Sequence, residues 1–567
     1  MAHASKVHLK LIHTSDVHGN FFLWDYVNER PVRGSLARVY AYVESLRKSF
    51  GNRLILMDGG DVMQGTPVVY YSNTVAPGDK SFSAEIMNYM RYDVGTIGNH
   101  DIETGHRVYD SWVRDCNFPI IGANVLDKNT GQPYLRPYTI IERCGVRTAV
   151  LGMTTPAVPN WLSPDLWSGL EFDDMVYCAE RWMKIIREKE HPDVVIGLFH
   201  SGKEGGIITD EYIENAALDV ARKVPGFDLV CYGHDHARNV ERITACDGRE
   251  VVCCAPAGLA SVVDEIDIVI RIKDDVKSIL SIDAKIVDLS YYKAPETHYF
   301  HRYFKRHLRN TEYYVQQKIG SFTRTISSED AYFGSSAFVD LIHRAQLEET
   351  GAQVSLAPPL SFSAQIKAGD VCVRDMFNLY SHENTLYTLR FTGREIKGIL
   401  EMSYGSWVTQ MKTTDDHIMQ IDYVLEGGKR LGFKNLAYNF DSAAGICYEV
   451  DVTKPYGEKV NILCLSDGTP FDMDMTYTVT TNSYRGNGGG ELLTKGAGIT
   501  HKELLNRLLR STDLDLRHYL IKYIQDRGVI DPQPLGHWKF VPEEWAAPAC
   551  ERDRELLFGF RHKEEEK

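Results

Sequence analysis

The stretch LKLIHTSDVHG, residues 9–19, is an apolar run that ends in an aspartate and a histidine. A continuous apolar run bounded by turn residues is typical of a strand that is buried on both faces. Helical patterns separate such runs along this chain, which predicts a mostly parallel sheet with Asp, Asn and His side chains along one edge. Four further stretches share the form of the first: RLILMDGGD (53–61), DVGTIGNHD (93–101), DVVIGLFHSG (193–202) and FDLVCYGHDH (227–236).

The polar residues that end these runs are potential metal ligands. Asp16 and His18 are separated by one residue, so they would share a face of an extended strand end. Asp61 follows two glycines and could bridge two ions, and Asn99 adds a neutral oxygen. Neutral imidazole suits Zn, Mn, Fe, Co or Ni better than Ca or Mg. Two divalent ions about 3.5–4 Å apart, as in two-metal hydrolases, would need the full set, which is Asp16, His18, Asp61, Asn99, His200, His234 and His236.

Each motif alone has a plainer interpretation. A single Asp-x-His in a loop is more often a turn or a helix cap, and Gly-Asn-His or Gly-His-Asp-His could be glycine turns with surface histidines. Five such endings in one chain argue jointly against that interpretation.

His100 follows the Asn ligand and is not needed to complete the seven. A histidine beside a dinuclear site can stabilise a transition state or protonate a leaving oxygen. Its orienting partner would be Asp101 or Glu103. A purely structural histidine is the alternative.

Length and composition set outer limits. A chain of 567 residues exceeds what one hydrophobic core usually supports, which predicts two domains. No apolar run is long enough to span a bilayer, and the net charge of −14 argues against a partner that is a long nucleic acid. Eleven cysteines without CxxC pairs specify no disulfide framework. The start, MAHASKVHLK, has no apolar signal core, so the protein is either cytosolic or separated from its leader.

Strand and helix patterns continue beyond the five endings. YTIIERCGVRTAVLGM, residues 138–153, predicts a hairpin that turns at Cys144-Gly145, and EYIENAALDVARKV, residues 211–224, predicts a helix. The stretch from about residue 250 to 289 predicts strands that complete a second sheet. The resulting divisions are a first domain over 1–293, a connecting helix over 294–320, a second mixed domain over 321–530 and a tail of loop and frayed surface over 531–567.

In this order the five endings resemble the calcineurin-like metallophosphoesterase family, whose signature runs D-x-H, G-D, G-N-H-[DE], H, G-H-x-H. The resemblance covers about residues 7–290. It implies an α/β (α+β) fold whose N-terminal domain is a metallophosphoesterase β-sandwich flanked by helices. It also implies one metal held by Asp16, His18, Asp61 and His236, and a second held by Asp61, Asn99, His200 and His234.

The whole chain is similar to the two-domain 5′-nucleotidase superfamily, with a connecting helix and a C-terminal α/β domain that ends in a Gly-rich loop. In that superfamily the C-terminal domain clamps the base between two aromatic rings. The resemblance places the rings at Phe440, in YNFDSAAG, and Tyr484, in TTNSYRGNGGG, and adds Asn482, Gly488 and Gly489 to the substrate site. Without the resemblance, Phe440 would be interpreted as a core residue.

Departures from the 5′-nucleotidase pattern indicate which branch of this superfamily the chain resembles. The stretch VSLAPPLSFSAQIKAG, residues 354–369, lacks the arginine expected there, and Gly488-Gly489-Gly490-Glu491-Leu492 lacks the expected aspartate. Glu103 stands where those enzymes usually have aspartate. These differences resemble the bacterial 2′,3′-cyclic-nucleotide 2′-phosphodiesterase/3′-nucleotidase branch.

The resemblance therefore implies a phosphoric ester hydrolase that acts on small nucleotides through a metal-bridging hydroxide, in the periplasm or outside the cell. The alternatives are a 5′-nucleotidase or UDP-sugar hydrolase of the same fold and, from another class, an inactive nucleotide-binding protein. The sequence does not indicate an oligomeric state.

Overall fold

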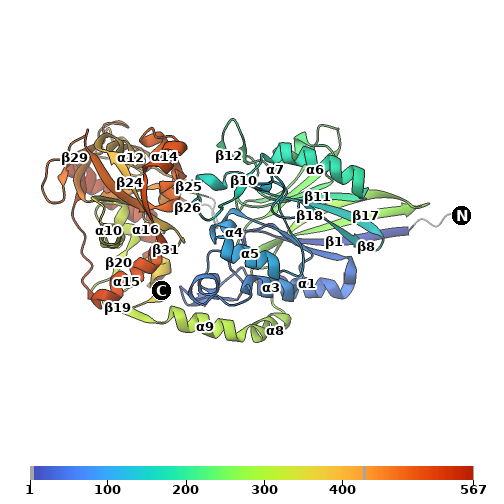
Figure 1. The fold of residues 1–567 in the computed structure, drawn as a ribbon. Coiled ribbons are helices and arrows are strands. Elements are labelled where there is room, and N and C mark those ends of the chain that lie inside the picture. The colour runs from blue at the N-terminus through green and yellow to red at the C-terminus, as the bar shows by residue number, and fades with distance from the viewer. Residues whose placement is uncertain (1–4, 425–429, 566–567) are drawn as a thin grey trace. The chain divides into compact units, whose positions relative to one another are not determined.

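The computed structural model describes residues 5–424 and 430–565. The chain divides into two compact units, Met1–Tyr314 and Val315–Lys567 (Figure 1). Each unit is described by itself below.

The N-terminal unit contains two six-stranded sheets. In the first, three parallel pairs join β1 to β4, β4 to β5 and β5 to β6, while β17 and β18 add antiparallel strands next to β1. Its strands, in sheet order, are β18 (Val276–Asp288), β17 (Val262–Lys273), β1 (Ser5–Thr14), β4 (Leu54–Asp58), β5 (Val94–Thr96) and β6 (Ile120–Ile121).

The second sheet has a parallel centre and an antiparallel strand at each edge. The single parallel sheet expected from the five apolar runs is therefore wrong, because three runs lie in the first sheet and two in the second. The strands are β15 (Arg238–Thr244), β16 (Glu250–Pro256), β14 (Leu229–Tyr232), β11 (Val194–His200), β9 (Val146–Thr154) and β8 (Tyr138–Arg143).

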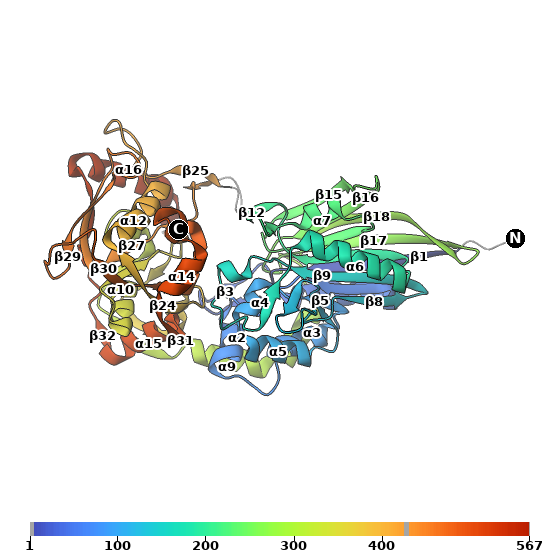
Figure 2. The same cartoon turned by 45° about the horizontal axis from the view of Figure 1, so that its top comes forward.

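Alternating residues of the strands fill three cores. Leu54 and Leu56 of β4 face one core, and Ile55 and Met57 face another that both sheets share. Both faces of the central strands are thus buried, which explains their continuous apolar runs. The outer face of the first sheet is covered by α1 (Leu36–Phe50), α3 (Phe82–Met90) and α5 (His106–Asp115), and the outer face of the second sheet by α6 (Met175–Glu190) and α7 (Ala217–Lys223), as Figures 1 and 2 show.

Two local predictions can be compared directly with the structure. The hairpin over β8 and β9 is confirmed, and its two turn residues, Cys144 and Gly145, have φ of 51° and 74°. Positive φ at both positions is what a two-residue hairpin turn requires. The helix expected over 211–224 begins only at Ala217, because β13 (Ile213–Asn215) pairs with β12 (Gly205–Ile208).

The single connecting helix expected over 294–320 is two helices in the structure. They are α8 (Glu296–Tyr303) and α9 (Lys305–Val315), and β19 (Lys318–Phe322) follows. Phe300 and Phe304 are fully buried and pack on Phe22, so this segment belongs to the core of the N-terminal unit. This packing accounts for the two phenylalanines only, because Tyr299, Tyr303 and Tyr313 of the same segment are exposed.

The C-terminal unit is built on a five-stranded sheet and two three-stranded sheets. The five strands, in order, are β27 (Ser442–Ala444), β21 (Val354–Ala357), β30 (Thr476–Asn482), β24 (Thr385–Thr392) and β31 (Leu508–Asp515). The smaller sheets combine β29 (Val460–Leu465), β28 (Ile446–Asp451) and β33 (Trp538–Val541), and β23 (Gly369–Cys372), β19 and β32 (Val529–Ile530). Its long helices are α10 (Ala337–Thr350), α12 (Gly393–Trp407), α15 (Leu516–Arg527) and α16 (Glu543–Glu565).

The loop and frayed surface expected over 531–567 is wrong for most of that range. β33 pairs in parallel with β28, and Trp538, Phe540 and Phe558 are buried in the core of the C-terminal unit. Burial of these three large side chains orders the segment, and only the last two residues of the range lie outside the described part of the chain. Among the described residues, no helix is long and apolar enough to cross a bilayer.

Candidate functional site

The five strand endings converge although they belong to two sheets. Asp16 and His18 follow β1, Asp61 follows β4, and Asn99 opens α4 (Asn99–Glu103) after β5. The second sheet contributes three histidines, because His200 ends β11 and the loop after β14 carries His234 and His236. The carboxyl ends of neighbouring parallel strands lie at one edge of a sheet, so each sheet presents its set at one edge.

The backbone at most of these residues has an unusual conformation that sets the direction of their side chains. Five of the seven residues have positive φ, a conformation that is uncommon for residues other than glycine. The values are 52° at Asp16, 48° at His18, 58° at Asp61, 82° at His234 and 52° at His236. Strain of this kind persists where the surrounding structure imposes it, and it clusters at functional sites.

Asp16, His18 and His236 form the first group of donors. One donor atom of each lies within 4.8 Å of the others. The Nε2 atoms of His18 and His236 are 3.1 Å apart, and His236 Nε2 is 3.5 Å from Asp16 Oδ1. Asp16 is fully buried, and its carboxylate accepts the Ser15 hydroxyl and the His234 amide.

Asp61, His200 and His234 form the second group, again with donor atoms within 4.8 Å of one another. His200 Nε2 is 3.1 Å from Asp61 Oδ2 and 3.1 Å from Asn99 Oδ1. Asp61 Oδ2 also lies 3.9 Å from His18 Nε2, so this carboxylate faces both groups. The structure thus brings together all seven residues that the sequence singled out.

The protonation of these groups is uneven. Burial lowers the pKa of His18 to about 4. Burial also lowers the pKa of His200, but the Asp61 charge and hydrogen bond outweigh it and raise the pKa to about 10. Burial raises the pKa of Asp16, yet the hydrogen bond with His236 and the nearby imidazole charges bring it down to about 2.

This donor set fits divalent transition metals. Imidazole nitrogens, carboxylates and one amide oxygen suit Zn, Mn, Fe, Co or Ni, and such ions displace protons from their ligands. The Nδ1 atom of His200 is 2.8 Å from the Gly59 carbonyl oxygen, which fixes the ring with Nε2 facing Asp61.

Of the two acidic partners expected for His100, only one contacts it. His100 Nδ1 is 2.6 Å from Glu103 Oε2, one turn further along α4. Burial lowers the pKa of His100, but Asp61 and Glu103 outweigh it and raise the pKa to about 9.

Asp101 has a different position from the one expected. Its buried carboxylate accepts the amide N–H groups of Asp61, Val62, Met63 and Gly98 at 2.8 to 3.0 Å. A catalytic role for Asp101 is therefore wrong, since both oxygens are used to hold the backbone of the Asp61 loop against α4.

Sequence reasoning missed Glu214, in β13. Its Oε1 atom is 3.2 Å from His234 Nε2, and its Oε2 atom accepts the Ile207 amide at 2.7 Å. A carboxylate in this position orients the imidazole. The stretch 211–224 has a helical pattern, so its sequence gives no indication of a strand whose glutamate contacts His234.

The base-binding pair expected in the C-terminal unit needs correction. Phe440 has no exposed surface, and its ring centroid is 5.2 Å from that of Trp407 and 5.4 Å from that of Phe433. A ring without exposed surface cannot stack on a ligand, so Phe440 is a core residue. Tyr438, two residues earlier, is half-buried and meets Tyr484 edge to face with 6.4 Å between ring centroids.

The other residues expected at the substrate site support this tyrosine pair. The buried Asn482 accepts the Arg485 amide at 2.8 Å and so caps α13 (Ser483–Gly486), the turn that carries Tyr484. A Cβ atom on Gly489 would lie 2.6 Å from the Tyr484 ring, and Gly488 has φ of 100°. Both glycines are buried, so they allow the loop to pack beneath Tyr484.

Two family models match this chain. The calcineurin-like phosphoesterase model matches residues 9–238, and the 5′-nucleotidase C-terminal domain model matches residues 316–495. The first range contains all seven candidate ligands, and the second contains both tyrosines.

Two curated relatives match most of this chain, and a third matches part of it. The 2′,3′-cyclic-nucleotide 2′-phosphodiesterase/3′-nucleotidase of Haemophilus influenzae is 26% identical, with 95% of this chain and 88% of that protein covered. The trifunctional nucleotide phosphoesterase protein YfkN of Bacillus subtilis is 27% identical over 95% of this chain, which spans only 39% of that relative's length. The 5′-nucleotidase of Vibrio cholerae is 30% identical over 40% of each chain.

Solved structures share the fold. A crystal structure from Staphylococcus aureus, in complex with alpha-ketoglutarate, matches 94% of this chain and 100% of its own with a TM-score of 0.75 at 20% identity. The 5′-nucleotidase precursor of Thermus thermophilus matches 95% of this chain and 100% of its own with a TM-score of 0.64 at 20% identity. The chain thus combines a calcineurin-like phosphoesterase domain with a 5′-nucleotidase C-terminal domain in the two-domain 5′-nucleotidase fold, and it is a phosphoric ester hydrolase.

Proposed function

We propose that the protein hydrolyses small nucleotides, opening 2′,3′-cyclic nucleotides and then removing the 3′-phosphate. The observation that carries this proposal is the pair of donor groups that share Asp61 Oδ2, at 3.1 Å from His200 Nε2 and 3.9 Å from His18 Nε2. The choice of branch is supported by the relative from H. influenzae, which this chain matches over 88% of its length.

Two divalent ions would be held by the seven candidate ligands, with Asp61 facing both. When bound, such ions neutralise phosphate oxygens and make a water molecule nucleophilic. His100 holds a proton with its Nδ1 atom turned to Glu103, which leaves Nε2 to donate to the departing ribose oxygen. Glu103 orients the ring and stabilises its protonated form.

Replacing His100 by asparagine is expected to lower kcat by about 10²-fold, the lower end of what general acid catalysis contributes. Glu103→Gln should lower it about 10-fold, because the ring would lose its carboxylate partner. Both variants should keep the wild-type metal content, measured by elemental analysis next to steady-state rates. If the His100→Asn variant kept the wild-type kcat, a group other than His100 would protonate the departing ribose oxygen.

Tyr438 and Tyr484 would hold the nucleotide base. Stacking of a base on an aromatic side chain contributes about 1–3 kcal/mol, so either tyrosine replaced by alanine should raise KM roughly 5- to 100-fold. KM for an aryl phosphate without a base should stay unchanged. Tyr456→Ala is the matched control, because this tyrosine is 62% exposed on another loop of the same unit. Equal increases in KM for both substrates would contradict the base-binding role.

A 5′-nucleotidase or nucleotide-sugar hydrolase is the second candidate, favoured by the match to the enzyme of V. cholerae. The discriminating experiment is a substrate panel of 2′,3′-cyclic AMP, 3′-AMP, 5′-AMP and UDP-glucose, assayed with Mn²⁺. Higher kcat/KM for the first two substrates supports the proposal, and preference for 5′-AMP overturns the choice of branch. A protein that turns over none of them while binding nucleotides would be the inactive nucleotide-binding alternative.

We also propose, from the same resemblance, that the protein acts in the periplasm or outside the cell. Cell fractionation with an antibody against the C-terminal unit tests this location, and signal confined to the cytosolic fraction would overturn it.

A further inference from the structure

A second cluster of metal-ligand residues lies inside the C-terminal unit. Asp340 and His343 are three residues apart on one face of α10, and His537 directly precedes β33. One donor atom of each residue lies within 4.8 Å of the others. All three are buried, with exposed fractions of 1%, 0% and 8%.

Hydrogen bonds leave Asp340 with one carboxylate oxygen for the cluster. Its Oδ2 atom accepts the Ser335 hydroxyl and the Leu535 amide, both at 2.7 Å. The other oxygen, Oδ1, is 3.9 Å from His537 Nδ1. Burial raises the pKa of Asp340 and outweighs the opposing effects of His537, Arg344 and the two hydrogen bonds.

The tautomer of His343 follows from its partners. Ser355 donates its hydroxyl proton to Gln346 Oε1 at 2.7 Å, so Ser355 Oγ must accept the proton of His343 Nδ1 at 2.8 Å. The Nε2 atom of His343 therefore carries the lone pair, which accepts the Ser442 hydroxyl at 3.2 Å, and an ion bound at this nitrogen would displace that hydroxyl. Burial holds the pKa of His343 well below its usual range, and burial also lowers the pKa of His537.

The cluster also contains an unsatisfied polar atom. His537 Nε2 is buried and, among the described residues, has no hydrogen-bond partner. An unpaired buried polar atom costs about 1–3 kcal/mol, so native structures rarely retain one without a bound ion or water.

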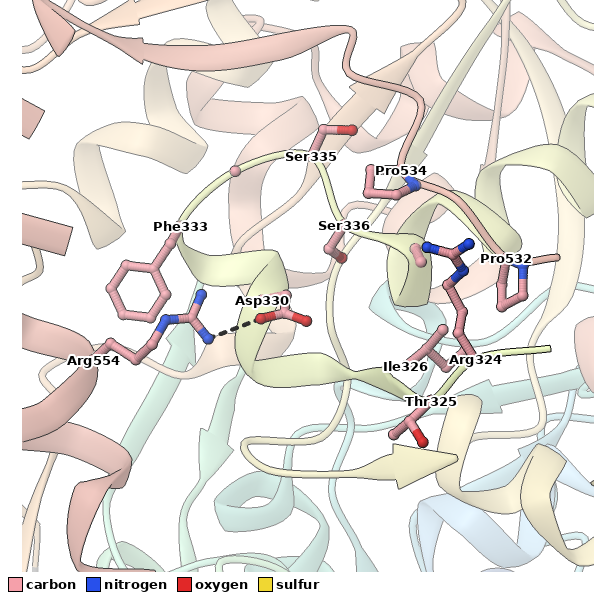
Figure 3. Close-up of a pocket in the computed structure, with 12 residues that line it drawn as sticks. Arg324, Thr325, Ile326, Asp330, Phe333, Ser335, Ser336, Pro532, Pro534 and Arg554 are labelled. Atoms are coloured by element: carbon pink, nitrogen blue, oxygen red, sulfur yellow. Dashed lines mark hydrogen bonds and ion pairs between the residues drawn. The ribbon is translucent and has the colours of Figure 1, made fainter. Parts of the chain in front are cut away.

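A pocket of about 380 Å³ is lined by Ser335 and Ser336, next to the start of α10. Ser335 lines this pocket and donates to Asp340 (Figure 3). The two arginines of the pocket are paired, Arg554 with Asp330 at 2.8 Å and Arg324 with Asp531 at 2.7 Å. The charges of both arginines are thus balanced by carboxylates.

We propose that Asp340, His343 and His537 bind one divalent transition-metal ion, with Zn²⁺ as the best fit. Two neutral imidazoles and one carboxylate oxygen are a common protein donor set for zinc, and a fourth position would be filled by water or a serine hydroxyl. The ion would compensate the Asp340 charge and link α10 to the strand that carries Trp538 and Phe540 into the core. Its role would be structural and independent of the candidate centre in the N-terminal unit.

The test is a metal count on the full chain. Wild-type protein and an Asp16→Ala/Asp61→Ala variant, which loses the carboxylate of each N-terminal donor group, are stripped with chelator, reloaded with Zn²⁺, desalted and measured by elemental analysis. The proposal expects one ion per chain to remain in the double variant. It also expects Co²⁺ to give visible absorption there, with the intensity of a tetrahedral site. A double variant that retains no ion overturns the proposal without any change to the C-terminal unit.

Added substitutions locate the ion. In the same background, His343→Ala and His537→Asn should each lose the remaining ion, and Zn²⁺ should no longer raise the melting temperature. His518→Ala, at an exposed histidine of α15, is the matched control and should keep the ion. Retention of the ion in both the His343→Ala and the His537→Asn variant would place it elsewhere and refute the assignment.

Discussion

Replacing Asp61 by asparagine is expected to lower kcat for nucleotide hydrolysis by about 10⁴-fold, because an ion that stabilises transition-state charge contributes several kcal/mol. The substitution should remove the metal-binding oxygen of Asp61 and keep its hydrogen bond to the backbone. Asp61 Oδ1 accepts the His100 amide at 2.8 Å, and an asparagine oxygen can keep this bond. The Oδ2 atom, which faces His18 and His200, would become an amide nitrogen that cannot bind a cation.

Metal content and activity should fall together in the Asp61→Asn variant. Elemental analysis at limiting Mn²⁺ should show loss of at least one ion from the N-terminal unit, while circular dichroism stays at the wild-type spectrum. Asp165→Asn is the control, because that carboxylate is exposed on the same unit and lies outside both donor groups. Wild-type kcat in the Asp61→Asn variant at saturating metal would show that Asp61 does not bridge two ions.

The sequence predicted the donors better than the layers that carry them. Asp16, His18 and the other ligands follow apolar runs, and such endings are visible as local patterns. The assignment of β11 and β14 to a second sheet is not local, because it depends on strand pairings between residues far apart in the chain. A strand buried on both faces gives the same apolar run in either sheet.

Substrate residues were harder to predict for a related reason. Phe440 and Tyr438 are two residues apart, and their exposure is decided by which of them packs against Trp407. Glu214 reaches His234 only because β13 interrupts a helical pattern. The order of residues 531–541 likewise depends on pairing between β33 and β28, a long-range contact without a local signal.

Arg485→Met is expected to have the largest effect on stability. The arginine is fully buried, and its Nε and Nη2 atoms donate to the two carboxylate oxygens of Asp441 at 3.0 and 2.8 Å. Other guanidinium N–H groups bond to the Tyr438 carbonyl at 2.9 Å and to the Gly489 carbonyl. Breaking a buried ion pair by removing one partner costs about 3–5 kcal/mol, because the other charge stays buried and uncompensated.

The same bonds join the segment of Tyr438 to the loop of Tyr484, so Arg485→Met should raise KM for nucleotides as well as destabilise the unit. An Arg485→Met/Asp441→Leu variant separates the effect on stability from the effect on KM.

Because this double variant has no buried charge at the site, it should regain most of the lost unfolding free energy, measured by hydrogen exchange on peptides from residues 440–465. It should keep the raised KM, because nothing would then hold the Tyr438 carbonyl. Arg510→Met, at an exposed pair with Glu349, is the control and should change stability by less than about 0.5 kcal/mol. If the double variant recovered a wild-type KM, the Arg485 bonds would serve stability alone, and the two tyrosines would be positioned by the surrounding core.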